Sequence, residues 1–162
     1  MLELVLPDVA RHAAWLASHR EWGPGLHEDG FGIAADDDVE SADGFAAWVG
    51  RQRSLPAARA WWIVDGGTVL GGIALRTGSN DTVLRLGHVG YGIRPSARGR
   101  GIATWALGQV LPHARAAGLS RLLLVCLADN VGSIRTIERH GGVVEEPDDR
   151  GDAVVRRYWI AL

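Results

Sequence analysis

The chain has 162 residues, of which 47% are apolar and 22% charged, and this composition excludes global disorder and favours a single folded domain over residues 1–162. The formal net charge of −2 excludes the broad basic surface that binds nucleic acid, so we expect no nucleic-acid partner. The single Cys126 excludes an internal disulfide, and no run of about 18 apolar residues predicts a membrane span, so we expect a cytoplasmic protein without a membrane partner or a metal site.

Hydrophobic periodicity predicts one strand, two helices and a hairpin in the first half of the chain. A glycine-rich stretch without a clean period separates the two helices and is typical of a long functional loop. The predicted elements are a strand at Leu2–Leu6, a helix from Pro7-Asp8 to about His19, a loop at residues 21–40, a helix at Ser41–Arg53 with Ser41 as N-cap, and a hairpin at residues 60–76 that turns at Asp65-Gly66-Gly67.

The next strand is unusual because it contains several glycines. Apolar alternation predicts a strand over Val83–Arg94, and Gly87, Gly90 and Gly92 all lie within it. Glycine weakens a strand unless another backbone or a ligand must come close. We therefore expect something to approach this strand.

The remaining elements are predicted to continue the alternation of strands and helices. A helix followed by a buried strand implies a parallel strand pair, and Pro112 within that helix predicts a kink or an early helix end. The predicted elements are a helix at Gly99–Ala117 stopped by Gly118, a strand at residues 122–128, a helix at Val131–Arg139 that ends at Gly141-Gly142, and strands at Val143–Glu146 and Ala153–Ile160.

Three arginines, Arg94, Arg98 and Arg100, lie just ahead of the predicted helix at Gly99–Ala117. The first amide groups of a helix lack partners within it, and the helix dipole favours an anion there. Gly99 and Gly101 would let the main chain approach a phosphate, and Arg98 and Arg100 would add charged hydrogen bonds. The alternative is that the three side chains merely solvate the start of the helix.

Two motifs carry a resemblance to a known family. Arg98-Gly99-Arg100-Gly101-Ile102-Ala103 resembles the acyl-CoA pyrophosphate loop, Q/R-x-x-G-x-G/A, of the GNAT N-acetyltransferases. Asn130-Val131-Gly132-Ser133, followed by Glu138 and Gly141-Gly142, resembles the N-x-x-S helix of the same superfamily. The sequence around both motifs is similar to that of a subgroup of bacterial predicted acetyltransferases with similarity to the RimJ/RimL-like type.

The resemblance implies an α/β (α+β) GNAT fold that covers essentially the whole chain. It implies a mixed central sheet of about seven strands with about four helices, and the two strands on either side of the loop and its helix splay apart. It implies acetyl-CoA (coenzyme A) as the acyl donor, with pantetheine along the glycine-bearing strand. The implied cofactor-binding residues are Tyr91, Gly92, Ile93, Arg98, Gly99, Arg100, Gly101, Ile102, Ala103, Asn130 and Ser133.

The resemblance also implies direct attack of an amine on the thioester within a ternary complex. Many GNATs carry a tyrosine seven residues after the motif asparagine, but that residue is Ile137 here, which leaves Ser133 as the expected partner of the departing sulfur. His88 has a usual pKa suited to a general base, and Tyr91 is the competing polar group. The alternative for His88 is packing on the far face of the sheet.

For the acceptor, the sequence favours a primary amine of a small molecule, contacted by Trp22, His27 and Glu28 in the long loop. Asp36, Asp37 and Asp38 could also attract a cation there, although an acidic surface loop is the commoner explanation. A protein or peptide N-terminus and a non-catalytic acyl-CoA-binding module are the alternatives. A dinucleotide site fails because Thr104 stands where a third glycine is required. The sequence does not distinguish a monomer from a homodimer.

Overall fold

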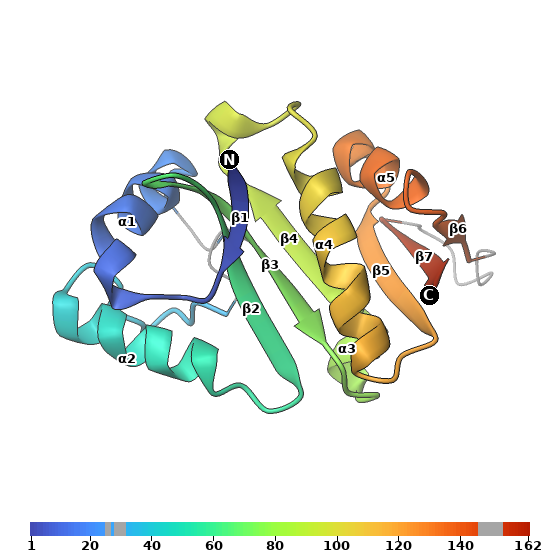
Figure 1. The fold of residues 1–162 in the computed structure, drawn as a ribbon, viewed down its shortest axis with the longest axis horizontal. Coiled ribbons are helices and arrows are strands. Elements are labelled where there is room, and N and C mark those ends of the chain that lie inside the picture. Colours follow the sequence, from blue (N-terminus) through green and yellow to red (C-terminus); the bar gives the residue numbers. More distant parts are fainter. Residues whose placement is uncertain (25–26, 28–31, 146–153) are drawn as a thin grey trace.

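The computed structural model describes residues 1–24, 27, 32–145 and 154–162 (Figure 1). Two short 3-10 turns lie at Val9–Arg11 and Pro95–Ala97. The strands and helices are β1 (Leu2–Val5), α1 (His12–Glu21), α2 (Ala42–Arg53), β2 (Ala58–Asp65), β3 (Thr68–Arg76), α3 (Asp81–Leu86), β4 (Val89–Ile93), α4 (Ile102–Ala116), β5 (Arg121–Leu127), α5 (Val131–Glu138), β6 (Val143–Val144) and β7 (Val155–Ala161).

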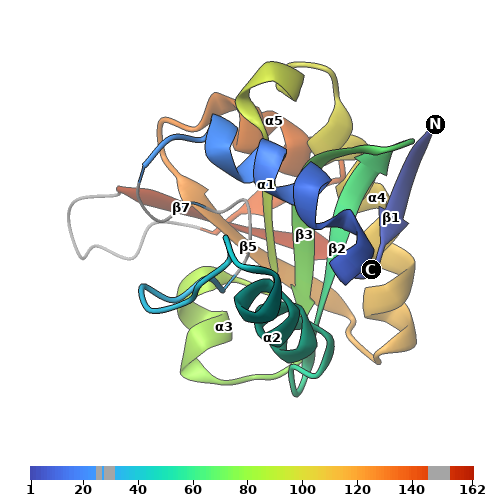
Figure 2. The same ribbon diagram turned by 90° about the vertical axis from the view of Figure 1, so that its left-hand side faces the viewer.

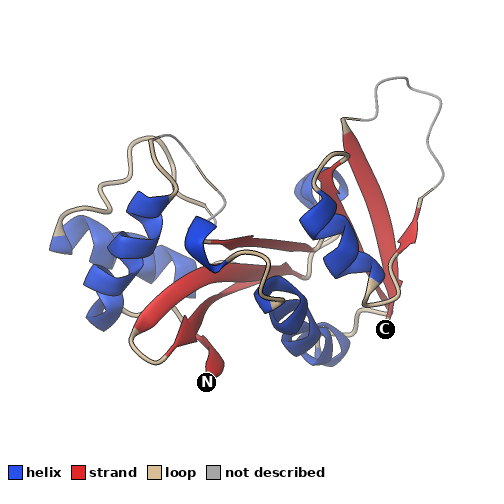
Figure 3. Ribbon diagram, turned by 90° about the horizontal axis from the view of Figure 1, so that it is seen from above, coloured by secondary structure: helices blue, strands red, loops and turns tan. Residues whose placement is uncertain are grey.

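The strands form two antiparallel sheets that meet at one point. The first sheet has the order β1-β2-β3-β4, and the second has the order β5-β7-β6. The predicted parallel pair is not found in the described part of the chain, where the link between the two sheets is one isolated antiparallel bridge between Gly87, two residues before β4, and Leu124 of β5. Beyond that bridge the sheets turn away from each other (Figure 3). The seven strands and the splay confirm the predicted fold class, with five α-helices where about four were expected.

Side chains on the two faces of the first sheet enter two separate clusters. Trp61 and Ile63 of β2 pack with α4, whereas Trp62 and Val64 face α1 and α2, as alternation along a strand requires. Directly paired residues share a face, so the registers of β2, β3 and β4 assign every position of β4 to one side. Tyr91 therefore faces α4, while its glycine neighbours face the side of α1 and α2.

Helix α3 corrects the prediction of one strand over Val83–Arg94. The Asn80 side chain accepts the amide of Val83 at 3.1 Å and caps a helix that ends at Gly87, whose φ is 84°. Strand β4 therefore covers only the last part of the predicted range. The apolar alternation misled because Leu84 and Leu86 are 54% and 43% exposed instead of facing a core.

Helix α4 continues through Pro112 to Ala116, so the predicted early end is not found. Its neighbour α5 closes against it, since His140 Nε2 lies 2.7 Å from the carbonyl oxygen of Thr104 and Gly108 faces the His140 ring. Residues 146–153 lie outside the described part of the chain, as do the predicted strand ends at Glu146 and Ala153. Among the described residues, no helix is long and apolar enough to cross a membrane.

We expect Gly71→Ala to destabilise the first sheet strongly. A Cβ at Gly71 would lie 2.0 Å from the carbonyl oxygen of Gly92, and only a backbone shift could relieve that contact. The free energy of unfolding, measured in urea, should fall by about 2 kcal/mol or more. Gly50→Ala is the control, because a Cβ at Gly50 meets nothing within 4 Å and the helical position should gain about 0.5–1 kcal/mol. Equal stability of the two variants would contradict this packing.

Candidate cofactor and active site

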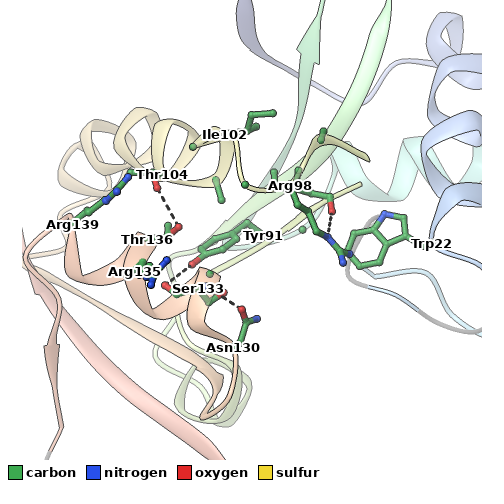
Figure 4. A pocket seen from close by; sticks show the side chains of 17 residues that line it. Trp22, Tyr91, Arg98, Ile102, Thr104, Asn130, Ser133, Arg135, Thr136 and Arg139 are labelled. Atoms are coloured by element: carbon green, nitrogen blue, oxygen red, sulfur yellow. Dashed lines mark hydrogen bonds between the residues drawn. The ribbon is translucent and has the colours of Figure 1, made fainter. Parts of the chain in front are cut away.

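A cavity of about 460 Å³ lies where β4 and β5 diverge (Figure 4). Its walls come from β4, the loop and first turn of α4, and α5, and Trp22 from the end of α1 closes one side. The lining residues are Trp22, Tyr91, Gly92, Ile93, Ala97, Arg98, Gly99, Gly101, Ile102, Ala103, Thr104, Asn130, Gly132, Ser133, Arg135, Thr136 and Arg139. The structure thus brings the two predicted motifs to one cavity, although they lie about thirty residues apart in the chain.

One end of this cavity has the geometry of an anion site. Gly101 is the N-cap of α4 in the left-handed conformation, with φ 74°, and no side chain caps the helix. The residues of the first turn, Ile102, Ala103 and Thr104, line the cavity, so their free amides face it. A Cβ at Gly99 or Gly101 would meet nothing within 4 Å, which leaves room for a ligand against the main chain. An anion there would also be favoured by the dipole of the fifteen-residue helix.

The three arginines of the predicted cluster have different environments. Arg98 lines the cavity, where its Nε donates to the carbonyl of Ile93 at 2.9 Å and its guanidinium lies 4.6 Å from the centre of the Trp22 ring. Arg94 instead forms an ion pair with Glu21 and is largely buried. Arg100 is exposed and is not among the lining residues. Of the two arginines predicted as phosphate ligands, Arg98 lines the cavity and Arg100 does not.

Glu21 ties the end of α1 to the chain that leads into the anion site. Its carboxylate accepts the amide of Ser96 and, at 3.0 Å, the hydroxyl of Ser96, and it pairs with Arg94. These contacts, the Ser96 amide first among them, hold the pKa of Glu21 below its usual value. The next residue, Trp22, is thereby positioned over Arg98.

The opposite wall is the first turn of α5. Asn130 caps this helix, because its Oδ1 accepts the amide of Ser133 at 3.0 Å. The Tyr91 hydroxyl reaches across from β4 and lies 3.5 Å from the carbonyl oxygen of Ser133, so these two predicted residues face each other (Figure 4). The Asn130 oxygen is thus engaged within the protein, and only its amide nitrogen is left for a ligand.

Two cationic residues of the cavity were missed in the sequence. Arg135 and Arg139 lie four residues apart on one face of α5 and its cap, and both line the cavity. Each is exposed, and neither has an ion pair among those found in the described residues. The helical spacing of the two arginines was the signal that could have identified them.

His88 lies outside the cavity and clasps the two sheets together. Its amide donates to the carbonyl of Leu123 at 2.7 Å, and its Nδ1 accepts the amide of Leu123 at 2.8 Å. The residue is 9% exposed, its ring lies edge-on to Trp159, and burial lowers the pKa of His88 below its usual value. This placement corresponds to the packed alternative, and the proposed base role has no support from the geometry.

The acceptor residues proposed from the sequence are placed only in part. Trp22 lines the cavity, whereas His27 stacks behind its ring at 5.5 Å and its Nε2 lies 2.9 Å from the carbonyl of Gly23. Glu28 lies outside the described residues. Asp37 and Asp38 have structural partners, because Asp37 pairs with Arg51 and Asp38 accepts the amide of Ser41 at 3.0 Å.

Comparisons with known proteins agree with this geometry. Residues 5–143 match the family model of the acetyltransferase (GNAT) domain. No curated protein matches the chain. Among solved structures, microcin C7 self-immunity acetyltransferase MccE with acetyl-CoA and AMP has a TM-score of 0.70 at 15% identity and covers 99% of this chain and 92% of its own. A putative GNAT-family acetyltransferase from Bordetella pertussis has a TM-score of 0.68 at 20% identity, and the match covers 99% of this chain and 95% of that protein. RimL, a ribosomal L7/L12 alpha-N-protein acetyltransferase with coenzyme A, has a TM-score of 0.67 at 19% identity, covering 99% and 94%.

The two hydrogen bonds between His88 and Leu123, here called the clasp, predict that the stability of the fold depends on the protonation of His88. Because its pKa is lower in the folded than in the unfolded chain, the unfolded state takes up the proton first as pH falls. Wild-type stability should therefore decrease as pH falls below about 6.5. Urea titrations at several pH values should show a shallower decrease in His88→Asn, whose amide oxygen can still accept the Leu123 amide.

Amide hydrogen exchange tests the clasp directly. Exchange at Leu123 should accelerate in His88→Ala and stay slow in His88→Asn. Slow exchange at Leu123 in both variants would show that the imidazole does not hold this amide.

Proposed function

The chain belongs to the GNAT acetyltransferase family, and on that basis we propose that it transfers an acetyl group from acetyl-CoA to a primary amine of a small molecule. The observation that carries the proposal is the cavity in the splay, where an uncapped helix N-terminus and Arg98 lie at one end and Ser133 with Tyr91 at the other. An anionic group and a reacting group of one extended molecule can occupy these two ends together. MccE and RimL, which share the fold, are complexes with acetyl-CoA and coenzyme A.

In this proposal the pyrophosphate lies against the amides that follow Gly99 and Gly101, beside the Arg98 guanidinium. Arg135 and Arg139 stand on α5 along the same cavity and add positive charge for the remaining phosphate. The pantetheine arm follows the outer edge of β4 past Gly92 toward Ser133. The Trp22 ring packs against the Arg98 guanidinium. The end of α1 thus contributes to cofactor binding through Arg98, even without a direct contact between Trp22 and the cofactor.

The reaction has two proton transfers. A primary amine with a pKa of about 10.4 must lose its proton before it attacks, which costs about 4 kcal/mol near neutral pH. Since His88 lies outside the cavity, we assign this proton to water at the acceptor side. The Ser133 hydroxyl would stabilise the departing thiolate by donating a hydrogen bond to it, with the Tyr91 hydroxyl as the neighbouring donor, and the thiolate would take its proton from solvent. No acyl-enzyme forms, because the amine attacks the thioester carbon directly.

The acceptor class has two candidates. MccE is a self-immunity enzyme in complex with AMP, whereas RimL acetylates a protein N-terminus, and each resembles this chain in fold at under 25% identity. A thiol-release screen with acetyl-CoA against amines, amino-acid derivatives and peptides tests the proposal. Turnover only with peptide N-termini would favour the second candidate, and binding of acetyl-CoA without turnover of any amine would leave a non-catalytic module.

We expect Gly101→Asp to abolish acetyl-CoA binding in calorimetry. The new carboxylate would stand at the helix N-terminus where the pyrophosphate lies, and it would repel the phosphates and fill the open space. Gly118→Asp is the matched control, because Gly118 follows the other end of α4 with φ 84° and a Cβ there also meets nothing within 4 Å. Unchanged affinity in Gly101→Asp would show that the phosphates bind elsewhere.

Ser133→Ala should lower turnover by about a hundredfold while the KM for acetyl-CoA changes little. The Ser133 amide still donates to Asn130 in this variant, so α5 keeps its cap and a rate loss reports the hydroxyl. Steady-state kinetics of thiol release measure both quantities, with the exposed Ser79→Ala as control. If Tyr91→Phe loses the rate and Ser133→Ala does not, the hydrogen-bond donor to the thiolate is Tyr91.

A further inference from the structure

We propose that a second cavity, on the α1 and α2 side of the first sheet, binds the far end of the acceptor through Gln52 and selects amines that carry a neutral hydrogen-bonding group such as a carboxamide. This inference rests on the proposed acetyl transfer and names the acceptor chemistry. The cavity has a volume of about 260 Å³ and is lined by the end of α2, the start of α3 and the sheet. Figure 2 shows α2 and α3 next to each other beside the strands.

The strand registers connect this cavity to the cofactor site. Ala74, which lines it, pairs directly with Gly90 of β4, and Gly72 pairs with Gly92, which lines the cofactor cavity. All four positions face α1 and α2, and three of them are glycines. No side chain from these positions stands between Ala74 and Gly92, and two residues along a strand span about 7 Å. A short, extended amine can therefore reach the thioester from the second cavity.

Gln52 is the lining residue whose buried amide oxygen, Oε1, lacks a hydrogen-bond partner among the residues that the structure describes. It is 5% exposed and lies at the end of α2. The other terminal atom, Nε2, is packed close to Gly32. A buried amide oxygen without a partner costs about 1–3 kcal/mol, which a ligand that bonds to the amide would recover.

The rest of the lining defines the remainder of the ligand. Leu55, Pro56, Ala58 and Val83 make most of the wall apolar, as in small-molecule sites with a few placed polar groups. Arg59 and Arg76 also line the cavity, and Nη1 of Arg76 lies 3.3 Å from the carbonyl oxygen of Gly87. A second ammonium group on the acceptor would meet these two guanidinium groups. A carboxylate has no hydrogen to donate to the Gln52 Oε1, whereas the N–H of a carboxamide can bond to it. The favoured tail is therefore apolar and ends in an uncharged donor and acceptor pair.

Ala57, in the turn between α2 and β2, shapes the rim. It is the one residue other than glycine with positive φ in the described chain, at 51°. Its carbonyl accepts both the amide and the hydroxyl of Thr77, at 2.8 and 3.1 Å. The strained turn is thus held against the end of β3, which keeps the cavity open beside Ala74.

The test compares acceptors of one length that differ at the far end. The probes are 6-aminohexanamide, heptylamine, hexane-1,6-diamine and 6-aminohexanoate, and binding to the coenzyme A complex is measured by calorimetry beside acetylation rates. Wild type should bind 6-aminohexanamide about tenfold more tightly than the other three. Gln52→Met keeps the side-chain volume and removes the amide that would form hydrogen bonds with the ligand. This variant should therefore lose the preference for 6-aminohexanamide without losing stability. Gln109→Met makes the same change at an exposed position of α4 and should leave the preference intact.

The outcomes separate the two levels of the proposal. If wild type binds acetyl-CoA but prefers the carboxylate or diamine, or binds the amide equally in wild type and Gln52→Met, the assignment of Gln52 is overturned. The same holds if the amide does not bind at all. If wild type binds no acetyl-CoA, the acetyltransferase proposal itself fails.

Discussion

The structure depends on the two hydrogen bonds between His88 and Leu123. They join a four-stranded and a three-stranded sheet at a single place, and Gly87 permits the contact because a Cβ there would lie 2.7 Å from the Leu123 carbonyl. Beyond this point β4 and β5 separate, and the described residues show no strand ladder between them. The gap is therefore a fixed consequence of a local clasp, and the cofactor cavity is the space that it leaves.

Charge is distributed so that the cavity keeps its positive potential. Glu21 neutralises Arg94 behind the loop, while Arg98, Arg135 and Arg139 line the cavity without a described carboxylate partner. The uncapped start of α4 adds its dipole to theirs. Because Glu21 is bonded to Ser96 and Arg94 and directly precedes Trp22, whose ring lies against the Arg98 guanidinium, the end of α1 helps to set the position of Arg98. A net-acidic chain can in this way present a local site for a phosphorylated ligand.

Elements that depend on neighbouring residues could be predicted from the sequence, and elements that depend on distant ones could not. The Ser41 cap, the turn at Asp65-Gly66-Gly67 and the loop before α4 follow from local chemistry and were placed correctly. The ion pair of Arg94 joins residues 73 apart in the chain, and the His88 clasp spans 35, so neither left a local pattern. Helix α3 was missed because a capped turn and a strand share one apolar alternation. The two GNAT motifs predicted the cavity because their glycines and the Asn130 cap determine the backbone conformation of its walls.

The glycines of β3 and β4 link the cofactor site to the acceptor side. Gly71 lets the two strands approach closely, and Gly72, Gly90 and Gly92 leave the opposite face of the same strands without side chains. Tyr91, between two of these glycines, points toward Ser133 on the cofactor side. In the proposed reaction, this one short strand would present a hydroxyl to the departing sulfur on one face and bare backbone to the incoming amine on the other. Gly92 lines the cofactor cavity, and Gly90 pairs with Ala74, which lines the second cavity, so the two glycines lie between the two proposed sites. Glycine weakens a strand unless another group must come close to its backbone, and a ligand on either side of β4 supplies that reason.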